Sequence, residues 1–494
     1  MRNPGNDKPY LAFDLGAESG RAVLGHLRSG ILTTEEVHRF PNEPVEYGGA
    51  LHWDVARLWL EVRRSLGNLK TELSGIGVDG WGVDYALLGE RGELLQNPYH
   101  YRDRRTAGAM EEVFRKVPKE GIYRATGIQF MPINTLYQLF AAQRDTPSIV
   151  AAAQQLVTIP DLFNFWLTGN AVCEFTNATT TQLVDPLRRN WATGMMQQIG
   201  LRPDLPAPIV EPGSLIGPLQ PGVAHNSCLT GTPVIAPACH DTGSAVAAIS
   251  ARDGTAFLSS GTWSLLGTEL DAPVITDDAL RLNFTNEGGV NGTTRLLKNV
   301  MGLWMLQGCR NAWVANGNSC DYSDLMEMAS CEEPFLHLVD PDDESFLRAT
   351  DMPGAIADFC RKTHQPAPAS PGAYCRCILE SLALKYRLVL RSLEQLTKKR
   401  CEQIRVIGGG SKNRLLNQFT ADATGRRVLA GPAEATALGN LAIQILATGG
   451  ASSLEEVRAM VDRSFPTEIF EPRNTDKWDQ QAERFEHYCE IIYA

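Results

Sequence analysis

The sequence predicts an α/β fold made of two blocks with a cleft between them, and two observations carry this prediction. The first is length, because 494 residues exceed what one hydrophobic core usually serves. The second is that both blocks open alike, with a buried strand, a turn of small residues and a returning strand, at residues 10–27 and 255–269. A nucleotide gripped by both turns would lie in the cleft.

Strands and helices alternate in the first block. Short apolar runs rich in β-branched or aromatic residues are assigned to strands, and longer runs with an apolar side at helical spacing are assigned to helices. The predicted strands are residues 10–15, 21–27, 36–40, 75–78, 83–88 and 234–236, and the predicted helices are 55–69, 135–142, 162–167 and 244–249.

The second block repeats this scheme in pattern, although not in sequence. Its predicted strands are residues 255–259, 264–269, 294–297, 404–407 and 428–430, and its predicted helices are 300–313, 378–396, a segment ending near 424, and 434–446. The boundary is expected between about Ile249 and Thr255, which gives domains at 1–250 and 251–494. The tail from about residue 453 to 494 is expected to be helical.

Composition and net charge restrict the classes of partner that the protein could bind. Hydrophobic residues make up 43% of the chain and charged residues 21%, as in ordinary globular proteins. The net charge of -11 argues against nucleic acid and anionic membranes, which need clustered Lys and Arg. No apolar run is long enough to span a membrane, and the first ten residues lack a signal-peptide core. We therefore expect a cytoplasmic protein with small-molecule partners.

A candidate proton acceptor lies in the segment 237–244, directly after a predicted strand. Asp241 would be ionised at neutral pH and is suited to general-base catalysis. A structural alternative is that Asp241 caps the helix at 244–249, and both roles are compatible. The neighbouring His240 is a second candidate for the base, although a lone histidine beside a strand more often packs or donates hydrogen bonds.

Three turns of small residues are candidates for binding phosphate. Glycines at 16, 20, 261 and 408–410 let backbone amides approach an anion, and Thr262 adds a hydroxyl donor. Neither a P-loop nor a dinucleotide fingerprint occurs, so the phosphate grip is of another type. Asp14 ends the first strand, and a carboxylate beside phosphates needs a cation between them, which indicates Mg²⁺. The alternative is that Asp14 only stabilises its own turn.

Several strings together resemble the FGGY carbohydrate kinases of the actin, hexokinase and Hsp70 fold superfamily. The strings that carry this resemblance are FDLG at 13–16, SSGTWS at 259–264 and IGGGSKN at 407–413. The longer strings GVDGWGVD at 77–84, GIQFMPINTLYQL at 127–139, TNATTTQLV at 176–184 and KNVMGLW at 298–304 most resemble the members that phosphorylate L-rhamnulose. The resemblance implies two actin-like (ribonuclease H-like) ATPase domains.

This resemblance also implies an activity and a set of site residues. The activity is ATP-dependent phosphorylation of L-rhamnulose at its C1 hydroxyl in rhamnose catabolism. By matching position, Asp241 is the proton acceptor, and the sugar contacts are Gly82, His240, Asp241, Thr242 and Asn299. The matching ATP contacts are Ala17, Glu18, Ser19, Gly20, Arg21, Thr262, Gln307 and Gly409, and Asp14 is added as the Mg²⁺ partner by analogy with the wider superfamily.

The chain departs from the family pattern at two positions. Glu18 stands where a small or hydroxyl residue is expected, and its carboxylate would repel the γ-phosphate unless it turns away or binds through the cation. Gly80 replaces an expected Thr, which removes a hydroxyl and a methyl group from the sugar side.

Two rival functions remain open at this point. One is a kinase for another ketose, such as fuculose or xylulose, because hydroxyl orientation is read by side-chain geometry that the sequence does not show. The other is an actin-like ATPase that drives partner binding. The strings around Gly82, Asn134 and Asn299 disfavour the ATPase, because such a scaffold has no reason to resemble a sugar kinase there.

Overall fold

The computed structural model describes residues 8–223, 227–318 and 321–490, and these residues form two compact units. The first unit comprises residues 1–250, 269–296 and 435–465, and the second comprises 251–268, 297–434 and 466–494. The chain therefore leaves the first unit near residue 250 and returns to it twice. The domain ranges 1–250 and 251–494 stay a prediction.

The first unit contains most of the strands of the first half of the chain. Its strands are β1 (Tyr10–Leu15), β2 (Ser19–Arg28), β3 (Ile31–Pro41), β4 (Pro44–Tyr47), β5 (Ala50–Trp53), β6 (Gly75–Gly80), β7 (Tyr85–Leu88), β8 (Gln155–Thr158), β9 (Cys173–Glu174), β10 (Val184–Asp185), β11 (Asn190–Trp191), β12 (Ile209–Val210), β13 (Leu215–Pro218), β14 (Pro233–Ile235) and β17 (Thr285–Gly288). Its helices are α1 (Val55–Asn68), α2 (Ala109–Phe114), α3 (Lys119–Thr126), α4 (Thr135–Asp145), α5 (Pro147–Ala152), α6 (Ile159–Thr168), α7 (Phe175–Thr180), α8 (Thr193–Ile199), α9 (Asp241–Ala247), α10 (Asp277–Arg281), α17 (Ala435–Ala447) and α18 (Leu454–Ser464).

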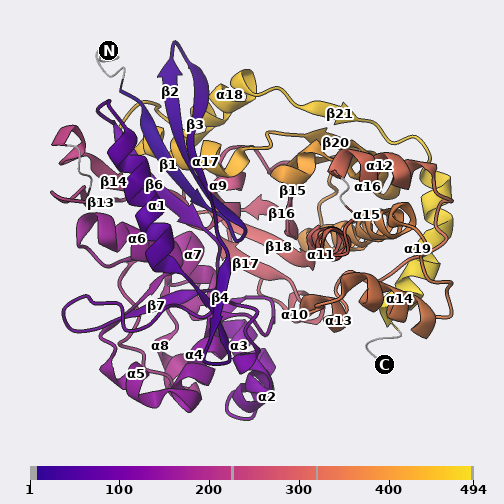
Figure 1. Cartoon of the computed structure of the whole chain (residues 1–494), viewed down its shortest axis with the longest axis horizontal. Helices are drawn as coiled ribbons and strands as arrows, with labels where there is room; N and C mark the ends of the chain where they lie inside the picture. The colour runs from indigo at the N-terminus through magenta and orange to yellow at the C-terminus, as the bar shows by residue number, and fades with distance from the viewer. Residues whose placement is uncertain (1–7, 224–226, 319–320, 491–494) are drawn as a thin grey trace. The chain divides into compact units, whose positions relative to one another are not determined.

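A six-stranded sheet organises the first unit, in the order β13-β14-β6-β1-β2-β3 (Figure 1). Strand β1 runs parallel to β6 and antiparallel to β2, while β14 runs parallel to β6. The carboxyl ends of β1, β6 and β14 therefore meet at one edge of the sheet. Ligand sites of open α/β sheets lie at this edge.

The helices α17 and α9 pack closely against each other in the first unit. Helix α17 is mostly buried and also contacts β1 and β6. A Cβ atom at Gly439 would lie 1.6 Å from the carbonyl oxygen of Ser244, so the two backbones touch where only glycine fits. This contact fixes the position of α9, whose first residue is Asp241.

The second unit contains the remaining elements. Its strands are β15 (Thr255–Ser260), β19 (Gln403–Ile407), β20 (Arg427–Ala430) and β21 (Glu468–Phe470), and the unit boundary runs within β16 (Trp263–Leu270) and β18 (Thr294–Met301). Its helices are α11 (Trp304–Ala315), α12 (Tyr322–Cys331), α13 (Glu344–Leu347), α14 (Met352–Lys362), α15 (Pro371–Thr397), α16 (Arg414–Thr424) and α19 (Thr475–Glu490).

The second sheet repeats the connections at the centre of the first. Its order is β17-β18-β16-β15-β19-β20-β21. Strand β15 is antiparallel to β16 and parallel to β19, as β1 is to β2 and β6. The long helix α15 is buried along much of its length and packs on α12 and α16. The predicted two-domain α/β architecture is therefore confirmed.

One predicted helix was wrong at its start. The segment 300–313 was predicted to be helical throughout, but β18 continues to Met301 and α11 begins only at Trp304. The backbone amides of Gly302, Leu303 and Trp304 instead donate to carbonyls of the turn at Gly261 and Thr262. Long-range pairing of this kind overrides the local helical pattern. The last four residues of the predicted helical tail, 491–494, lie outside the described residues.

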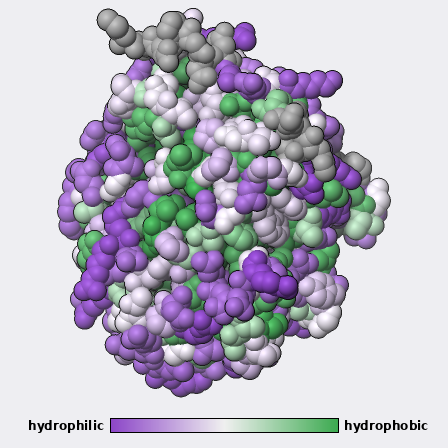
Figure 2. Space-filling model, turned by 90° about the vertical axis from the view of Figure 1, so that its left-hand side faces the viewer, coloured by the Kyte–Doolittle hydropathy of each residue, from purple (hydrophilic) through white to green (hydrophobic). Residues whose placement is uncertain are grey.

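The face of the molecule in Figure 2 shows hydrophobic patches interspersed among hydrophilic residues. Scattered apolar exposure of this kind is normal for a folded protein. Among the described residues, none of the helices is both long and apolar enough to cross a membrane.

Candidate active site

Three carboxyl groups gather at the carboxyl edge of the first sheet. In the parallel register of β1 and β6, Asp14 lies opposite Asp79, and Asp241 follows β14 at the start of α9. The charges of Asp14 and Asp241 help to raise the pKa of Asp79, and that of Asp14 helps to raise the pKa of Asp241, although burial is the main cause in both cases. Such mutual repulsion is typical of sites built for chemistry or for a cation.

Asp241 receives its donors on one oxygen. The amide nitrogen and Oγ1 of Thr242 donate to Oδ1 of Asp241, at 2.5 and 3.1 Å, and Nε2 of His240 lies 3.4 Å from the same atom. None of the described residues donates to Oδ2, and 33% of the side chain is exposed. Oδ2 is therefore the oxygen able to take a proton. The N-cap of α9 is His240, so the capping alternative for Asp241 is wrong.

Glu174, which the sequence reading missed, holds the loop before Asp241. Its Oε2 accepts hydrogen bonds from the Cys239 amide at 2.8 Å and from Thr176 Oγ1 at 2.6 Å. Thr176 Oγ1 in turn lies 3.2 Å from the His240 amide, which donates to it. Burial raises the pKa of Glu174 to about 8, against the opposing effect of these donors. The string TNATTTQLV that follows Glu174 was the available signal.

Asp79 is fully buried behind Asp14. Its Oδ2 accepts a hydrogen bond from Nδ2 of Asn440 at 2.5 Å, while its Oδ1 has no partner among the described residues. Burial raises its pKa well above the ordinary range. We therefore interpret Asp79 as a carboxyl that favours its protonated form, beside the more exposed Asp241.

The predicted residues 17–21 span the end of the turn between β1 and β2 and the first three residues of β2. Asp14 Oδ2 accepts from Nε and Nη2 of Arg21 at 2.9 and 2.6 Å, which neutralises the carboxylate. The turn is closed by the Gly16 amide, which donates to the Ser19 carbonyl at 3.1 Å. A Cβ at Gly20 would lie 2.2 Å from the Phe40 ring, so Gly20 is required by packing.

Glu18, which departs from the family pattern, is exposed. Its charge acts favourably on the guanidinium of Arg102, whose pKa burial lowers. Arg102 thus offsets part of the repulsion that Glu18 would exert on phosphate.

The loop after β6 places Gly82 against α7. A Cβ there would lie 3.0 Å from Oγ1 of Thr180, which also accepts from the Val83 amide at 3.0 Å. At Gly80, an added Cβ would lie 2.9 Å from the Leu15 carbonyl oxygen. The side chain of a threonine at position 80 would therefore clash with the backbone of β1. Replacing threonine by glycine here does not simply leave an empty space beside the sugar.

Two buried indole rings pack together beside Gly82. The ring centroids of Trp53 and Trp81 are 4.3 Å apart, and both indole nitrogens donate to Oδ2 of Asp84, at 2.6 and 3.0 Å. Nε2 of Gln138 donates to Oδ1 at 2.7 Å, and burial raises the pKa of Asp84 to about 6. Asp84 thus fixes these three side chains.

The predicted nucleotide residues of the second unit lie on linked segments. The carbonyl of Thr262 accepts from the amides of Gly302 and Trp304, both at 3.2 Å, and Trp304 begins the helix that carries Gln307. Asn299 lies on β18, three residues before Gly302. Thr262 and Gln307 are therefore held by one hydrogen-bonded turn.

The glycines at 408–410 differ in what they do. Gly408 has a φ of 81°, and a Cβ at Gly410 would lie 2.0 Å from Oγ of Ser260, so both are required by the local backbone. A Cβ at Gly409 meets nothing within 4 Å. A ligand can contact the backbone only where space is open beside it, and of these three glycines only Gly409 has such space.

The predicted site residues fall into two sets. Asp14, the turn 17–21, Gly82 and His240 to Thr242 belong to the first unit. Thr262, Asn299, Gln307 and Gly409 belong to the second.

The donor set around Asp14 fits a magnesium ion that keeps most of its own water. Mg²⁺ is usually held by one or two carboxylates together with phosphate oxygens. Within the described part of the chain no group of three or more His, Cys, Asp or Glu could hold a metal by itself. Asp14 therefore suits a cation that is bound together with phosphate oxygens.

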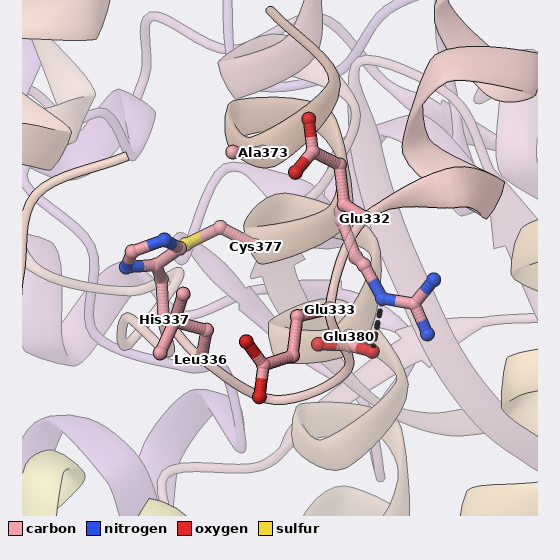
Figure 3. A pocket seen from close by; sticks show the side chains of 8 residues that line it. Glu332, Glu333, Leu336, His337, Ala373, Cys377 and Glu380 are labelled. Carbon is pink, nitrogen blue, oxygen red and sulfur yellow. Dashed lines mark hydrogen bonds and ion pairs between the residues drawn. The ribbon is translucent and has the colours of Figure 1, made fainter. Parts of the chain in front are cut away.

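A pocket in the second unit is lined by none of the predicted site residues (Figure 3). Its walls include Glu332, Glu333, His337 and Cys377, and Nε of Arg376 donates to Oε1 of buried Glu380 at 2.8 Å. Burial raises the pKa of Glu380 to about 7. The pocket is separate from the phosphate turns in sequence.

Comparison with known proteins identifies the class. Residues 9–248 match the N-terminal domain, and residues 256–448 the C-terminal domain, of the FGGY family of carbohydrate kinases. The chain belongs to this family. It is accordingly a sugar kinase, as predicted, and membership implies the use of ATP.

Curated relatives show which members of the family this chain is most similar to among those compared. A rhamnulokinase from Bacteroides thetaiotaomicron is 45% identical over 95% of this chain and 97% of its own length. A rhamnulokinase from Bacillus subtilis is 40% identical over 95% and 96% of the two chains. The predicted resemblance to the kinases of L-rhamnulose is confirmed.

Solved structures share the fold. A xylulose kinase from Lactobacillus acidophilus has a TM-score of 0.79 at 18% identity, covering 98% of this chain and 97% of its own. A glycerol kinase from Plasmodium falciparum, solved with ADP, has a TM-score of 0.77 at 17% identity and 98% coverage of both chains. The predicted actin-like two-domain architecture is thus the fold of sugar kinases.

Proposed function

We propose that the protein transfers the γ-phosphoryl group of ATP to the C1 hydroxyl of L-rhamnulose, giving L-rhamnulose 1-phosphate and ADP in rhamnose catabolism. The observation that carries the proposal is the near full-length identity of 40–45% to several rhamnulokinases. The rival function of a xylulose kinase is disfavoured, because three solved xylulose kinases are only 14–19% identical to this chain. We also propose that the reaction takes place in the cytoplasm.

Asp241 is the general base of this mechanism. Phosphoryl transfer leaves little covalent work for a protein beyond aligning the reactants, neutralising charge and accepting one proton. Oδ2 of Asp241 takes the proton of the sugar hydroxyl, since its Oδ1 is occupied by Thr242. Gly82, His240, Thr242 and Asn299 complete the sugar contacts.

Each of the two turns that open the halves of the chain carries proposed ATP contacts. The proposed ATP contacts are residues 17–21, Thr262, Gln307 and Gly409, with the hydroxyl of Thr262 as a donor to phosphate. Asp14 would hold Mg²⁺, which would supply charge neutralisation at the phosphates. Arg21 keeps Asp14 in place through its two hydrogen bonds.

Product analysis tests the proposed reaction. Purified protein with ATP, MgCl₂ and L-rhamnulose is expected to yield a single sugar phosphate, whose ³¹P resonance couples to the two C1 protons. A matched incubation without sugar measures hydrolysis by water and is expected to release ADP slowly. Phosphate on any other carbon, or no sugar phosphate, would show that the assignment is wrong.

A further inference from the structure

A buried pair, Glu287 and Arg295, lies directly behind the histidine that precedes the proposed base. Glu287 is in β17 and Arg295 is in the adjacent strand β18, and both belong to the first unit with His240. The Arg295 side chain is 0% exposed and that of Glu287 is 5% exposed. Nη2 of Arg295 lies 3.2 Å from Oε2 of Glu287, and its Nε donates to the Gly288 carbonyl at 2.8 Å.

Both members of the pair reach the same atom of His240. Nδ1 of His240 lies 3.2 Å from Nη2 of Arg295 and 3.2 Å from Oε2 of Glu287. On the other side of the ring, Nε2 lies 3.4 Å from Oδ1 of Asp241. The imidazole thus bridges a buried ion pair and the proposed base.

The chemistry of the guanidinium restricts where the imidazole proton can be. A guanidinium only donates, so its bond to Nδ1 exists only when Nδ1 carries a lone pair. The proton of the neutral ring is then on Nε2 and faces Asp241. In the other tautomer Nδ1 would donate to Glu287, and the Nε2 lone pair would face a carboxylate. A doubly protonated ring would face the positive charge of Arg295 at 3.2 Å.

The charges around this group favour the first arrangement. Burial lowers the pKa of Arg295, but the carboxylates of Glu287, Glu174, Asp241 and Glu269 oppose that effect in this order, so the guanidinium stays charged. The charge of Asp14 helps to raise the pKa of Asp241, after burial as the main cause. An N–H directed at Oδ1 counters this repulsion and helps keep the base ionised.

We propose that Arg295, held by Glu287, is a positioning residue that fixes His240 in the tautomer protonated on Nε2, so that His240 directs an N–H at Oδ1 of the base Asp241. The inference rests on the proposed function only for the role of Asp241. Arg295 acts through His240 and contacts neither sugar nor nucleotide in this account.

The tautomer of His240 is directly measurable in the full-length protein without any substrate. In protein labelled with ¹⁵N-histidine, the His240 resonances are assigned by their loss in His240→Gln. We expect the pattern of an Nε2-protonated neutral ring at pH 7.5. An Nδ1-protonated or doubly protonated ring would overturn the proposal. Because sugar is absent, this result stands whether or not L-rhamnulose proves to be the substrate.

Variants separate positioning from stability. In Arg295→Met we expect the His240 proton to move to Nδ1. Because the ionised base Asp241 then loses a hydrogen-bond donor, we expect the acidic limb of the pH profile of kcat/KM to move up by about one pH unit. Arg295→Lys keeps a charged donor and is expected to restore the tautomer. The profile is measured with whichever ketose the wild type phosphorylates.

Arg458→Met is the matched control. Arg458 is also buried and pairs with a buried glutamate, with its Nη2 2.7 Å from Oε2 of Glu269. We expect this variant to lose stability but to keep the His240 tautomer and the pH profile. An Arg295→Met protein that keeps both would overturn the proposal. If the Arg295→Met protein does not fold, the proposal is tested by the spectra of the wild-type and Arg295→Lys proteins. An Nδ1-protonated His240 ring in either protein would overturn it.

Discussion

The environment of Asp241 shows how single residues divide their tasks. Its Oδ1 is occupied by Thr242 and faces His240, whereas its Oδ2 is left to accept a proton. The place of Asp241 directly after a buried strand was predictable, because a carboxylate in that position is a local pattern, whereas its role as the base stays a prediction. The partners Glu174, Glu287 and Arg295 were not predictable, because they come from segments distant in sequence and their spacing carries no signal.

The substitution Asp241→Asn tests this division at the residue scale. The amide cannot accept the proton, so we expect kcat to fall by about 10² to 10⁴, while the KM for ATP stays near the wild-type value. Steady-state kinetics with MgATP measures both. Asp145→Asn, at the exposed end of α4, is the matched control and is expected to behave like wild type. Near-normal turnover in folded Asp241→Asn would show that another group is the base.

At the scale of elements, the periodicity of apolar residues in the sequence predicted most strands of both sheets and most of the helices that accompany them. The long helix α15 and the hairpins β1-β2 and β15-β16 follow from runs of apolar residues and small-residue turns. The failure at residues 300–303 has a physical reason, since their amides bond to the turn at 261–262 and not along a helix. Hydrogen bonds between segments about 40 residues apart leave no periodic trace in the sequence.

The crossing of α9 and α17 gives an element-scale prediction. In Gly439→Ala the new methyl group would collide with the backbone of Ser244, so we expect a loss of about 3 kcal/mol or more in the free energy of unfolding. A lower kcat should accompany it, because α9 carries Asp241. Urea denaturation followed by circular dichroism measures the first effect.

Gly67→Ala is the matched control for this crossing. Gly67 lies in α1 and an added Cβ meets nothing within 4 Å. We expect a gain of about 0.5 to 1 kcal/mol from helix propensity. Equal stabilities of the Gly439→Ala and wild-type proteins would contradict the close contact.

For the whole molecule, two units each present a hairpin followed by a parallel strand. Each unit carries predicted contacts of both kinds, to the sugar and to ATP, with Asp241 and residues 17–21 in the first and Asn299 and Thr262 in the second. The repeated pattern was readable from the sequence. The return of residues 269–296 and 435–465 to the first unit was not, because it depends on tertiary packing.

The most direct test of the central claim is the initial rate of ADP formation across a ketose panel at one MgATP concentration. The panel contains L-rhamnulose, L-fuculose, D-xylulose and a control without sugar. We predict the highest kcat/KM with L-rhamnulose and only slow ADP release without sugar. Comparable rates with all ketoses, or a rate with L-rhamnulose no higher than that without sugar, would contradict the account.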